Sequence, residues 1–336
     1  MKYLKLLFLF STISLVKVAN SQDFHFSQFY NNQIFLNPAM SGLAFGPRIS
    51  LHYRNQYPGI GAGAESGYTT YAVAYDQHVE KLNSGFGLLA MMDRTANGIY
   101  NRYNIFMTYA YQIRLSRKLG LKIGVYGGLN SANLDWNKLK FYDQIDPVNG
   151  FFGNLATAEV PPTSLSQHNF DGGFGFLFFN QNFYAGVTMR HLTFQKNFSY
   201  NSNNLSLTPL YLGSHVGMIK MFNKRNKTYL ALNLNYAFQY KNHELVPVAL
   251  FNYELINMGM GFRHTFKELE SLIFYVGVSK GIVRVNYSYD HTMSALSGYT
   301  GGSHELSFRF LFGGDDNSLR SKSLNGIIDC PTILKN

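Results

Sequence analysis

The sequence has one cysteine, few charged residues and, after residue 22, no long apolar run. The lone Cys330 excludes an internal disulfide, so we interpret it as an unpaired tail residue, with an intermolecular bridge as the alternative. Gly, Asn, Arg or Lys interrupts every later apolar stretch, which excludes a spanning helix of about 20 apolar residues. Yet 46% of the residues are hydrophobic and 14% charged, with 24 Tyr and 29 Phe. This balance favours a transmembrane β-barrel over a soluble enzyme.

Motifs of common catalytic sites are also absent from the sequence. It has no nucleophile elbow, no phosphate-binding loop and no dinucleotide-binding fingerprint. His243-Glu244 and His304-Glu305 lack the second histidine of a helical zinc site, and the ten histidines are scattered without ligand-type spacing. We therefore predict a protein that is not an enzyme, with no catalytic residue, cofactor or metal. An enzyme whose residues meet only in the folded chain stays open as the alternative.

The start of the sequence has the pattern of a secretory signal peptide. Lys2 and Lys5 precede an apolar run from Leu6 to Val16, and Ala19-Asn20-Ser21 is a small-x-small cleavage site. We predict a signal peptide at residues 1–21. A membrane anchor is disfavoured because the run is short and Lys17 follows it. No cysteine lies near the cleavage site, which argues against a lipoprotein.

The formal charge falls from +10 to +7 when the three lysines of residues 1–21 are removed. A basic balance also occurs in proteins that bind nucleic acid. Export makes anionic lipid headgroups of the outer membrane or acidic partners the expected contacts instead, so we predict no nucleic-acid partner.

Apolar and polar residues alternate with period two along much of the chain. Large apolar residues occupy every second position from Leu230 to Tyr240, from Val283 to Tyr289 and from Leu306 to Phe312. Period two indicates strands with two different faces. A β-sandwich would alternate too. However, the polar face is rich in Gly and Ala, aromatic residues cluster at strand ends, and the last strand ends in Phe. These features favour an outer-membrane barrel.

Turn residues divide this region into about fourteen expected strands. An even number suits a bacterial barrel, and the expected connections are alternately tight and long, which places short turns in the periplasm and long loops outside. The strands are expected near residues 48–56, 67–79, 84–94, 99–113, 120–132, 169–179, 182–194, 209–221, 228–240, 244–254, 257–266, 271–279, 282–290 and 303–312. The predicted fold is an all-β antiparallel transmembrane barrel over residues 48–312, with both ends of the mature chain in the periplasm.

Alternation turns several charged side chains toward the lumen. We expect a lumen-facing network of Arg48, Arg54, Arg190, Arg263, Arg284 and Arg309, with Asp76, Asp171, Asp290 and Glu305 as partners. One interpretation is a set of cross-strand ion pairs that fill a narrow interior. The other is a basic passage for acidic substrates, which predicts anion-selective conductance.

Two segments flank the expected barrel. Residues 22–47 are too apolar for a free tail, Pro38 removes a backbone donor, and Gly42 permits an unusual turn. We expect them on the periplasmic side, either as a plug folded into the barrel or as a lid on its turns. Residues 313–336 form an expected periplasmic tail that either contacts periplasmic machinery or is a disordered end. The candidate plug or partner contacts are Phe24, Phe26, Gln28, Phe29, Asn37 and Pro38.

Several short motifs occur in a distinctive order. Phe26-Ser27-Gln28 and Asn37-Pro38-Ala39 open the mature chain, Gly42 follows, and His304-Glu305-Leu306-Ser307 lies in the last strand. Tyr53-Arg54-Asn55-Gln56-Tyr57 and Ser84-Gly85-Phe86-Gly87 lie between them. From about residue 23 to 312 the chain resembles the PorP/SprF family of type IX secretion and gliding-motility membrane proteins. It departs from the family at Tyr57, where Trp is frequent, and in the tail that contains Cys330.

The resemblance implies an outer-membrane protein that is not an enzyme and works with type IX machinery. Its implied partners are periplasmic ring and motor components and a secreted adhesin or other cargo with a C-terminal sorting domain, which it helps to export or anchor at the surface. The alternative function is an outer-membrane channel for small hydrophobic or anionic solutes.

Overall fold

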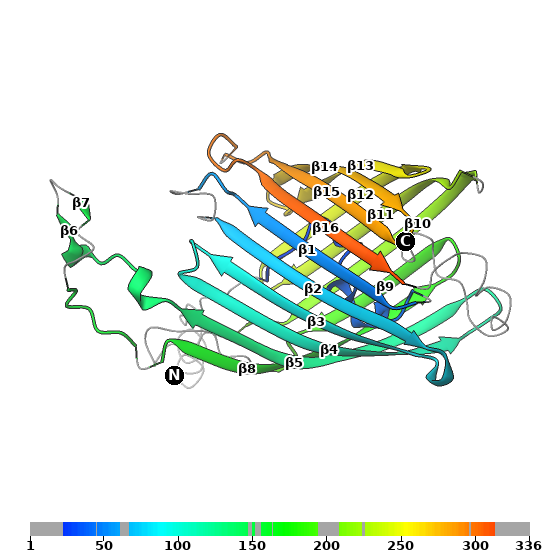
Figure 1. The fold of residues 1–336 in the computed structure, drawn as a ribbon, viewed down its shortest axis with the longest axis horizontal. Coiled ribbons are helices and arrows are strands. Elements are labelled where there is room, and N and C mark those ends of the chain that lie inside the picture. The colour runs from blue at the N-terminus through cyan, green and yellow to red at the C-terminus, as the bar shows by residue number, and fades with distance from the viewer. Residues whose placement is uncertain are drawn as a thin grey trace, which may run out of the picture.

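Fourteen strands of the chain close into a single antiparallel barrel in the computed structural model. The structure describes residues 23–44, 46–60, 67–146, 150–151, 156–162, 164–193, 208–223, 226–295 and 297–312. The expected signal peptide, the expected tail and Cys330 lie outside these residues. The predicted fold class is confirmed: each strand pairs with its neighbours in sequence order, and β16 pairs with β1 to close the barrel (Figure 1).

The barrel strands follow the predicted boundaries closely. They are β1 (Arg48–Gln56), β2 (Tyr68–Val79), β3 (Ser84–Thr95), β4 (Tyr100–Arg114), β5 (Gly120–Leu134), β8 (Ser166–Phe179), β9 (Phe183–Arg190), β10 (Tyr211–Asn223), β11 (Thr228–Gln239), β12 (Asn242–Tyr253), β13 (Ile256–His264), β14 (Leu269–Lys280), β15 (Val283–Thr292) and β16 (Ser303–Leu311). The expectation that one strand extends to residue 194 is wrong. β9 ends at Arg190 because His191 has a φ of 61°, which an extended strand does not accommodate.

Short elements lie outside the barrel wall. β6 (Ile145–Asp146) and β7 (Gly150–Phe151) form a separate two-stranded sheet in the connection between β5 and β8, and were not predicted. Three single turns of 3₁₀ helix are η3 (Glu80–Leu82), η4 (Trp136–Lys138) and η5 (Tyr142–Gln144).

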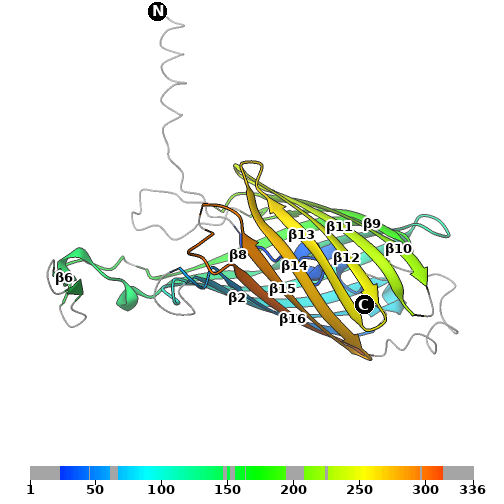
Figure 2. The same cartoon turned by 90° about the horizontal axis from the view of Figure 1, so that it is seen from above.

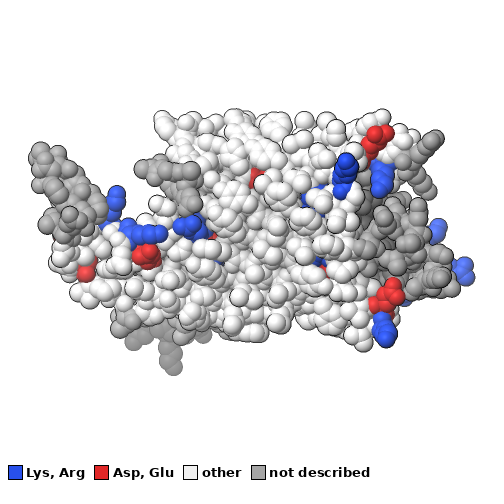
Figure 3. All heavy atoms as spheres, viewed as in Figure 1, with Lys and Arg blue, Asp and Glu red and all other residues white. Residues whose placement is uncertain are grey.

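The outer face of the barrel is apolar, as lipid requires. On β4, Met107 is 71% exposed, whereas its neighbours Phe106 and Thr108 are 8% and 5% exposed because they point into the lumen. The same alternation recurs on the other strands. Lys, Arg, Asp and Glu gather mainly toward the two ends of the barrel, with few on the wall between them (Figure 3). A belt of this kind matches the hydrocarbon layer of a membrane.

The two ends of the barrel differ in their connections. Residues 80–83, 115–119, 180–182, 224–227, 254–255 and 281–282 connect strands at one end, here called the short-turn end. Residues 57–67, 135–165, 191–210 and 293–302 are among the connections at the other end, called the long-loop end. In outer-membrane barrels short turns face the periplasm and long loops face outside.

Residues 23–44, here called the N-terminal segment, run through the lumen of the barrel (Figures 1 and 2). They include α2 (Gln33–Leu36) and η2 (Pro38–Met40), and most of their side chains are buried. Asp23 contacts Gln239 and His191 at the long-loop end, whereas Gly42 lies against Gly85 at the short-turn end. The periplasmic segment expected from the sequence covers residues 22–47, of which the structure describes 23–44, 46 and 47. The backbone enters β1 from the short-turn end, but the described start of the segment lies at the opposite end.

Candidate functional site

A buried charge cluster joins the N-terminal segment to the barrel wall. Arg54 donates to Asp290 at 3.0 Å, to Glu305 at 3.1 Å and to Ser27 Oγ at 2.7 Å. Arg263 donates to the same Asp290 oxygen at 3.0 Å and to Ser27 Oγ at 2.8 Å. These five side chains are almost fully buried. Two guanidinium groups and two carboxylates therefore meet around one serine of the segment.

Glu305 also holds the backbone of the segment. Its two oxygens accept hydrogen bonds from the backbone N–H groups of Ser27, at 2.8 Å, and Gln28, at 3.1 Å. The Gln28 side chain donates to the Glu305 carbonyl and to Ser288, and accepts from Ser307 at 2.7 Å. The Phe26-Ser27-Gln28 motif thus binds the His304-Glu305-Leu306-Ser307 motif of the last strand.

A second charge cluster surrounds Asp23 at the long-loop end. His191 Nε2 lies 2.7 Å from Asp23, and His191 Nδ1 lies 3.0 Å from Asp171. The Arg190 and Arg102 guanidinium groups lie 3.4 Å and 3.9 Å from the Asp23 carboxylate. The start of the N-terminal segment is therefore held by three basic side chains.

These contacts shift the pKa values of two groups that lie outside the strands. Burial alone raises the pKa of Asp23, but the charge of His191, assisted by Arg190 and Arg102, outweighs burial and holds that pKa well below its usual range. Burial alone lowers the pKa of His191, but Asp23 and Asp171 outweigh it and raise that pKa to about 9. At neutral pH the pair is therefore an ion pair.

A third cluster fixes the far end of the segment near the short-turn end. Arg48 makes a bidentate pair with Asp76, with both distances 2.7 Å, and also donates to the Gln33 side chain. Asp76 accepts from the Gly42 backbone N–H at 2.8 Å. Lys122 donates to the carbonyls of Ser41, at 2.7 Å, and Gly42. Bidentate pairs between arginine and carboxylate fix orientation as well as position.

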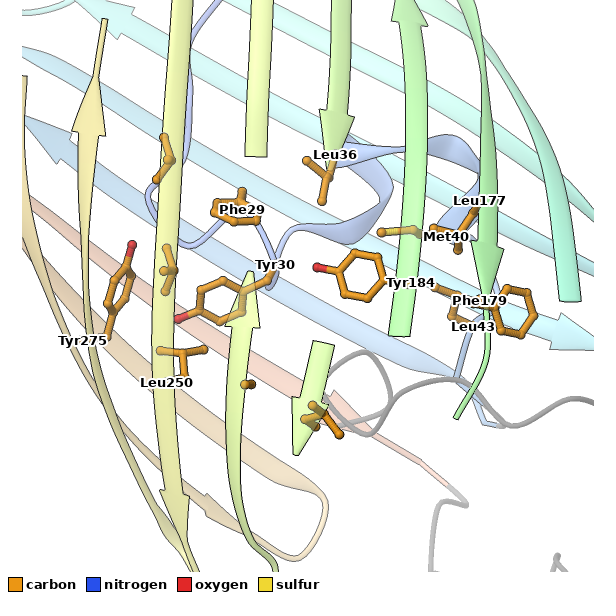
Figure 4. Packing of buried hydrophobic residues seen from close by; sticks show 14 of the residues in the cluster. Phe29, Tyr30, Leu36, Met40, Leu43, Leu177, Phe179, Tyr184, Leu250 and Tyr275 are labelled. Atoms are coloured by element: carbon orange, nitrogen blue, oxygen red, sulfur yellow. The ribbon is translucent and has the colours of Figure 1, made fainter. Parts of the chain in front are cut away.

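Apolar side chains fill the space between the segment and one side of the lumen (Figure 4). Phe29, Tyr30, Leu36 and Met40 of the segment belong to one buried cluster with wall residues of β8 to β14, including Tyr184. A second cluster holds residues of the segment against β2 to β5, the other side of the lumen. Burial of this apolar surface contributes roughly 25 cal/mol per Å² and stabilises the N-terminal segment in the lumen.

Glycines in the wall make room for the backbone of η2. A Cβ at Gly124 would lie 2.2 Å from the Ala39 nitrogen and 2.5 Å from the Pro38 carbonyl carbon, and one at Gly85 would lie 2.0 Å from the Ser41 oxygen. Pro38 occupies the first turn of η2, where its missing N–H costs little. Gly42, as predicted, has an unusual backbone, with a φ of 62°. Close packing between the two backbones, rather than the size of side chains, therefore determines how η2 fits against the wall.

Gly124→Ala is expected to displace the turn at Pro38–Met40, since the new methyl group meets backbone atoms that cannot rotate away. Overpacking costs about 1–3 kcal/mol, which corresponds to roughly tenfold higher access to the buried segment. The measurement is the maleimide labelling rate of Ser41→Cys in a Cys330→Ser background. Gly127→Ala on the same strand is the matched control, because a Cβ there meets only the Phe170 ring, at 3.3 Å. Equal labelling rates for the two variants would refute the close packing of η2 against Gly124.

The structure places every predicted site residue in or beside the lumen, but not in one network. Arg54, Arg263, Asp290 and Glu305 contact one another in one cluster. Arg48 pairs with Asp76 in a separate cluster, nearer the short-turn end. Arg190 belongs to the Asp23 cluster. Arg309 and Arg284 lie at the short-turn end, with Arg309 donating to Asn31 and Arg284 to Ser279.

The predicted contact residues of the segment all touch the wall or one another. Phe24 stacks on Phe35 at 5.2 Å, and Phe26 lies 5.6 Å from the His52 ring. Asn37 donates to the carbonyls of Phe176 and Val187. Phe29 and Gln28 are buried as described above, and Pro38 packs against Gly124.

Sequence reasoning missed four lumen residues that hold the segment. Lys122 and Arg102 occupy inward positions of alternating strands, so period two could have identified them. Glu244, which lies 3.4 Å from Arg263, begins an inward series on β12 in the same way. His191 follows the end of a strand in a left-handed conformation, and no periodic signal identifies it.

The described part of the chain contains neither a membrane-spanning helix nor a cluster of metal-ligating side chains. None of its helices is long and apolar enough to cross a membrane. No cluster of three or more His, Cys, Asp or Glu side chains that could hold a metal ion occurs among the same residues.

A closed antiparallel barrel with an apolar outer belt and an occupied lumen defines the class: this is an outer-membrane β-barrel protein. The profile of the family described as "Type IX secretion system membrane protein PorP/SprF" matches residues 18–310. The chain belongs to this family, and is thus a membrane component of type IX secretion. No curated protein matches the sequence.

Several solved outer-membrane proteins are similar at low identity. Omp33 of Acinetobacter baumannii is 8% identical, over 81% of this chain and 100% of that chain, with a TM-score of 0.45. The toluene transporter TbuX of Ralstonia pickettii is 13% identical over 84% and 94%, with a TM-score of 0.46. The CymD monoaromatic hydrocarbon channel is 11% identical over 84% and 93%, with a TM-score of 0.49.

Proposed function

We propose that this barrel is a closed scaffold of the type IX machinery, which supports export or surface anchoring of a partner protein with a C-terminal sorting domain. The observation that carries the proposal is the N-terminal segment, which runs along the lumen and is tied to the wall by three buried charge clusters. A lumen occupied in this way suits a protein that binds partners at its two ends rather than one that conducts a solute.

The two ends of the barrel offer different partners. The short turns face the periplasm under the usual orientation of outer-membrane barrels, where ring and motor components of the machinery would make contact. The long loops face outside, where a secreted adhesin or other cargo would be held. The apolar belt contacts outer-membrane lipid.

Removal of the gene is expected to abolish surface delivery of the cargo while leaving other outer-membrane proteins in place. The measurement is protease-accessible cargo on intact cells, together with mass spectrometry of proteins that co-purify with the tagged full chain from native outer membranes. Complementation with the intact gene is the control. Normal cargo delivery in the deletion strain, with no secretion component or exported protein recovered, would refute the proposal.

A channel for small hydrophobic or anionic solutes is the second candidate. The observation in its favour is that buried arginines and lysines outnumber buried carboxylates among the described lumen residues. A channel needs a path past the N-terminal segment, and the contacts of Ser27, Asn37 and Gly42 with the wall argue against one. Selective uptake of such a solute by cells would favour the channel.

A further inference from the structure

A cavity of about 320 Å³ lies at the short-turn end of the lumen. Its walls are the ends of strands β11, β12, β14, β15 and β16 together with residues 226–227, 254–255 and 281–282 of the short turns. We propose that this cavity binds an acidic peptide segment of a periplasmic partner, with Arg284 and Arg309 as the residues that bind its carboxylates. The inference deepens the proposed function, since it gives the contact with the machinery a defined place.

Two arginines stand directly opposite each other in the wall of the cavity. Arg284 of β15 is the register partner of Arg309 of β16, and both side chains line the cavity. Like charges directly opposite each other destabilise a sheet. A carboxylate in the cavity would be attracted by both charges, and arginine recognises carboxylates with paired hydrogen bonds.

The remaining lining of the cavity also favours an anion. Lys227 adds a third cationic side chain, whereas Glu254 is the one carboxylate among the described residues that line the cavity. Arg309 is itself buried, and its guanidinium donates to the backbone carbonyl and side chain of Asn31 at 3.1 Å and 3.0 Å. Arg284 donates to Ser279 at 2.7 Å. The charges are thus held in place before a ligand arrives, which lowers the cost of binding.

The shape of the cavity favours a peptide over a small inorganic anion. Apolar side chains of Tyr229, Leu255, Ile282, Val283 and Leu311 lie among the charged ones. Above the cavity, Asn31 and Tyr30 of the N-terminal segment occupy the lumen. A ligand that enters from the short-turn end therefore stops beneath the segment. A short stretch of chain with both acidic and apolar side chains matches such a site.

The test is binding of a fluorescein-labelled hexapeptide of alternating aspartate and leucine to the full chain in phospholipid nanodiscs, followed by fluorescence anisotropy. Arg284→Gln is expected to weaken binding about tenfold, because it removes one charge-assisted contact. Arg284→Lys keeps the charge and should recover part of that loss. High salt should weaken binding to the intact chain.

Lys280→Gln is the matched control, since it removes a charge beside the same turn from an exposed side chain that does not line the cavity. It should bind the peptide as the intact chain does. Unchanged binding by Arg284→Gln, or equal binding of a peptide with asparagine in place of aspartate, would overturn the proposal. Because the assay uses no cargo, it can fail or succeed independently of the proposed function.

One further comparison separates a partner from the chain itself as the source of the acidic segment. Asp315 and Asp316 follow Leu311 closely in sequence. Replacing both with asparagine is expected to leave peptide binding unchanged. Tighter binding by that variant would show that the chain's own carboxylates compete for the cavity, and would overturn the assignment to a partner.

Discussion

Deleting residues 23–42 is expected to turn a closed barrel into a conducting one. The segment passes through the lumen, while the hydrogen-bonded ladder of the wall does not include it. Water that enters the emptied lumen would solvate the charges that Ser27 and Gly42 now contact, so the wall should stay closed as a barrel. Barrels of more than about eight strands have room for more than their own side chains.

The measurement for this deletion is ion current across planar bilayers. We expect no steps from the intact chain and clear single-channel steps from the variant, with a mean current about tenfold or more above background. The steps should favour anions, since buried basic side chains outnumber buried carboxylates among the described residues. Heat-dependent mobility on gels verifies that the deletion variant is folded. Gly124→Ala should give channel openings that are shorter than those of the deletion variant. Equal currents from the intact and deleted chains would contradict an occluding role.

Arg54→Met is expected to destabilise the protein by about 3–5 kcal/mol, because removing one partner from a buried ionic cluster leaves uncompensated charge. Arg54 is almost fully buried and contacts Asp290, Glu305 and Ser27. Methionine keeps much of the volume, so lost charge rather than an empty space dominates the effect. The measurement is the free energy of unfolding in urea, followed by circular dichroism of the barrel in lipid vesicles.

Two further variants isolate the cause of that loss. Arg117→Met removes the same kind of side chain from an exposed turn, and should change stability by about 0.5 kcal/mol or less. Adding Glu305→Gln to Arg54→Met removes one of the stranded charges and should restore part of the stability, as a double-mutant cycle would show. A loss below about 1 kcal/mol for Arg54→Met would mean that the cluster is not what holds the segment.

The positions of these residues suggest why distant motifs occur together in one chain. Ser27 and Gln28 meet Glu305 across most of the sequence, Gly42 meets Gly85, and Arg54 joins the first strand to the same cluster. Closing the barrel brings β1 beside β16 and creates the site for Ser27 in the same event. The site for Ser27 therefore exists only once the wall has closed, whereas the strand pairs that close the wall do not include the segment.

The wall of the barrel was largely predictable from the sequence. Because one face of each strand contacts lipid and the other faces the lumen, apolar and polar side chains alternate along the strand. The position of Met107 and Thr108 in this alternation is therefore enough to place Met107 outside and Thr108 inside. Turn residues then gave the expected count of about fourteen strands, and the alternation of short turns and long loops agreed with that count. The end of β9 was not predictable, because His191 adopts a left-handed conformation that no periodic pattern marks, and its side chain contacts Asp23 and Asp171, which are distant in sequence.

By itself, then, the sequence determined a membrane barrel of about fourteen strands and the faces on which its arginines lie, because both follow from the local period-two alternation of side chains. Only the tertiary structure decided which charges meet, where Asp23 lies and how Gly124 admits the backbone of Ala39. Those contacts join residues far apart in the chain, and they exist only once the wall has closed around the segment.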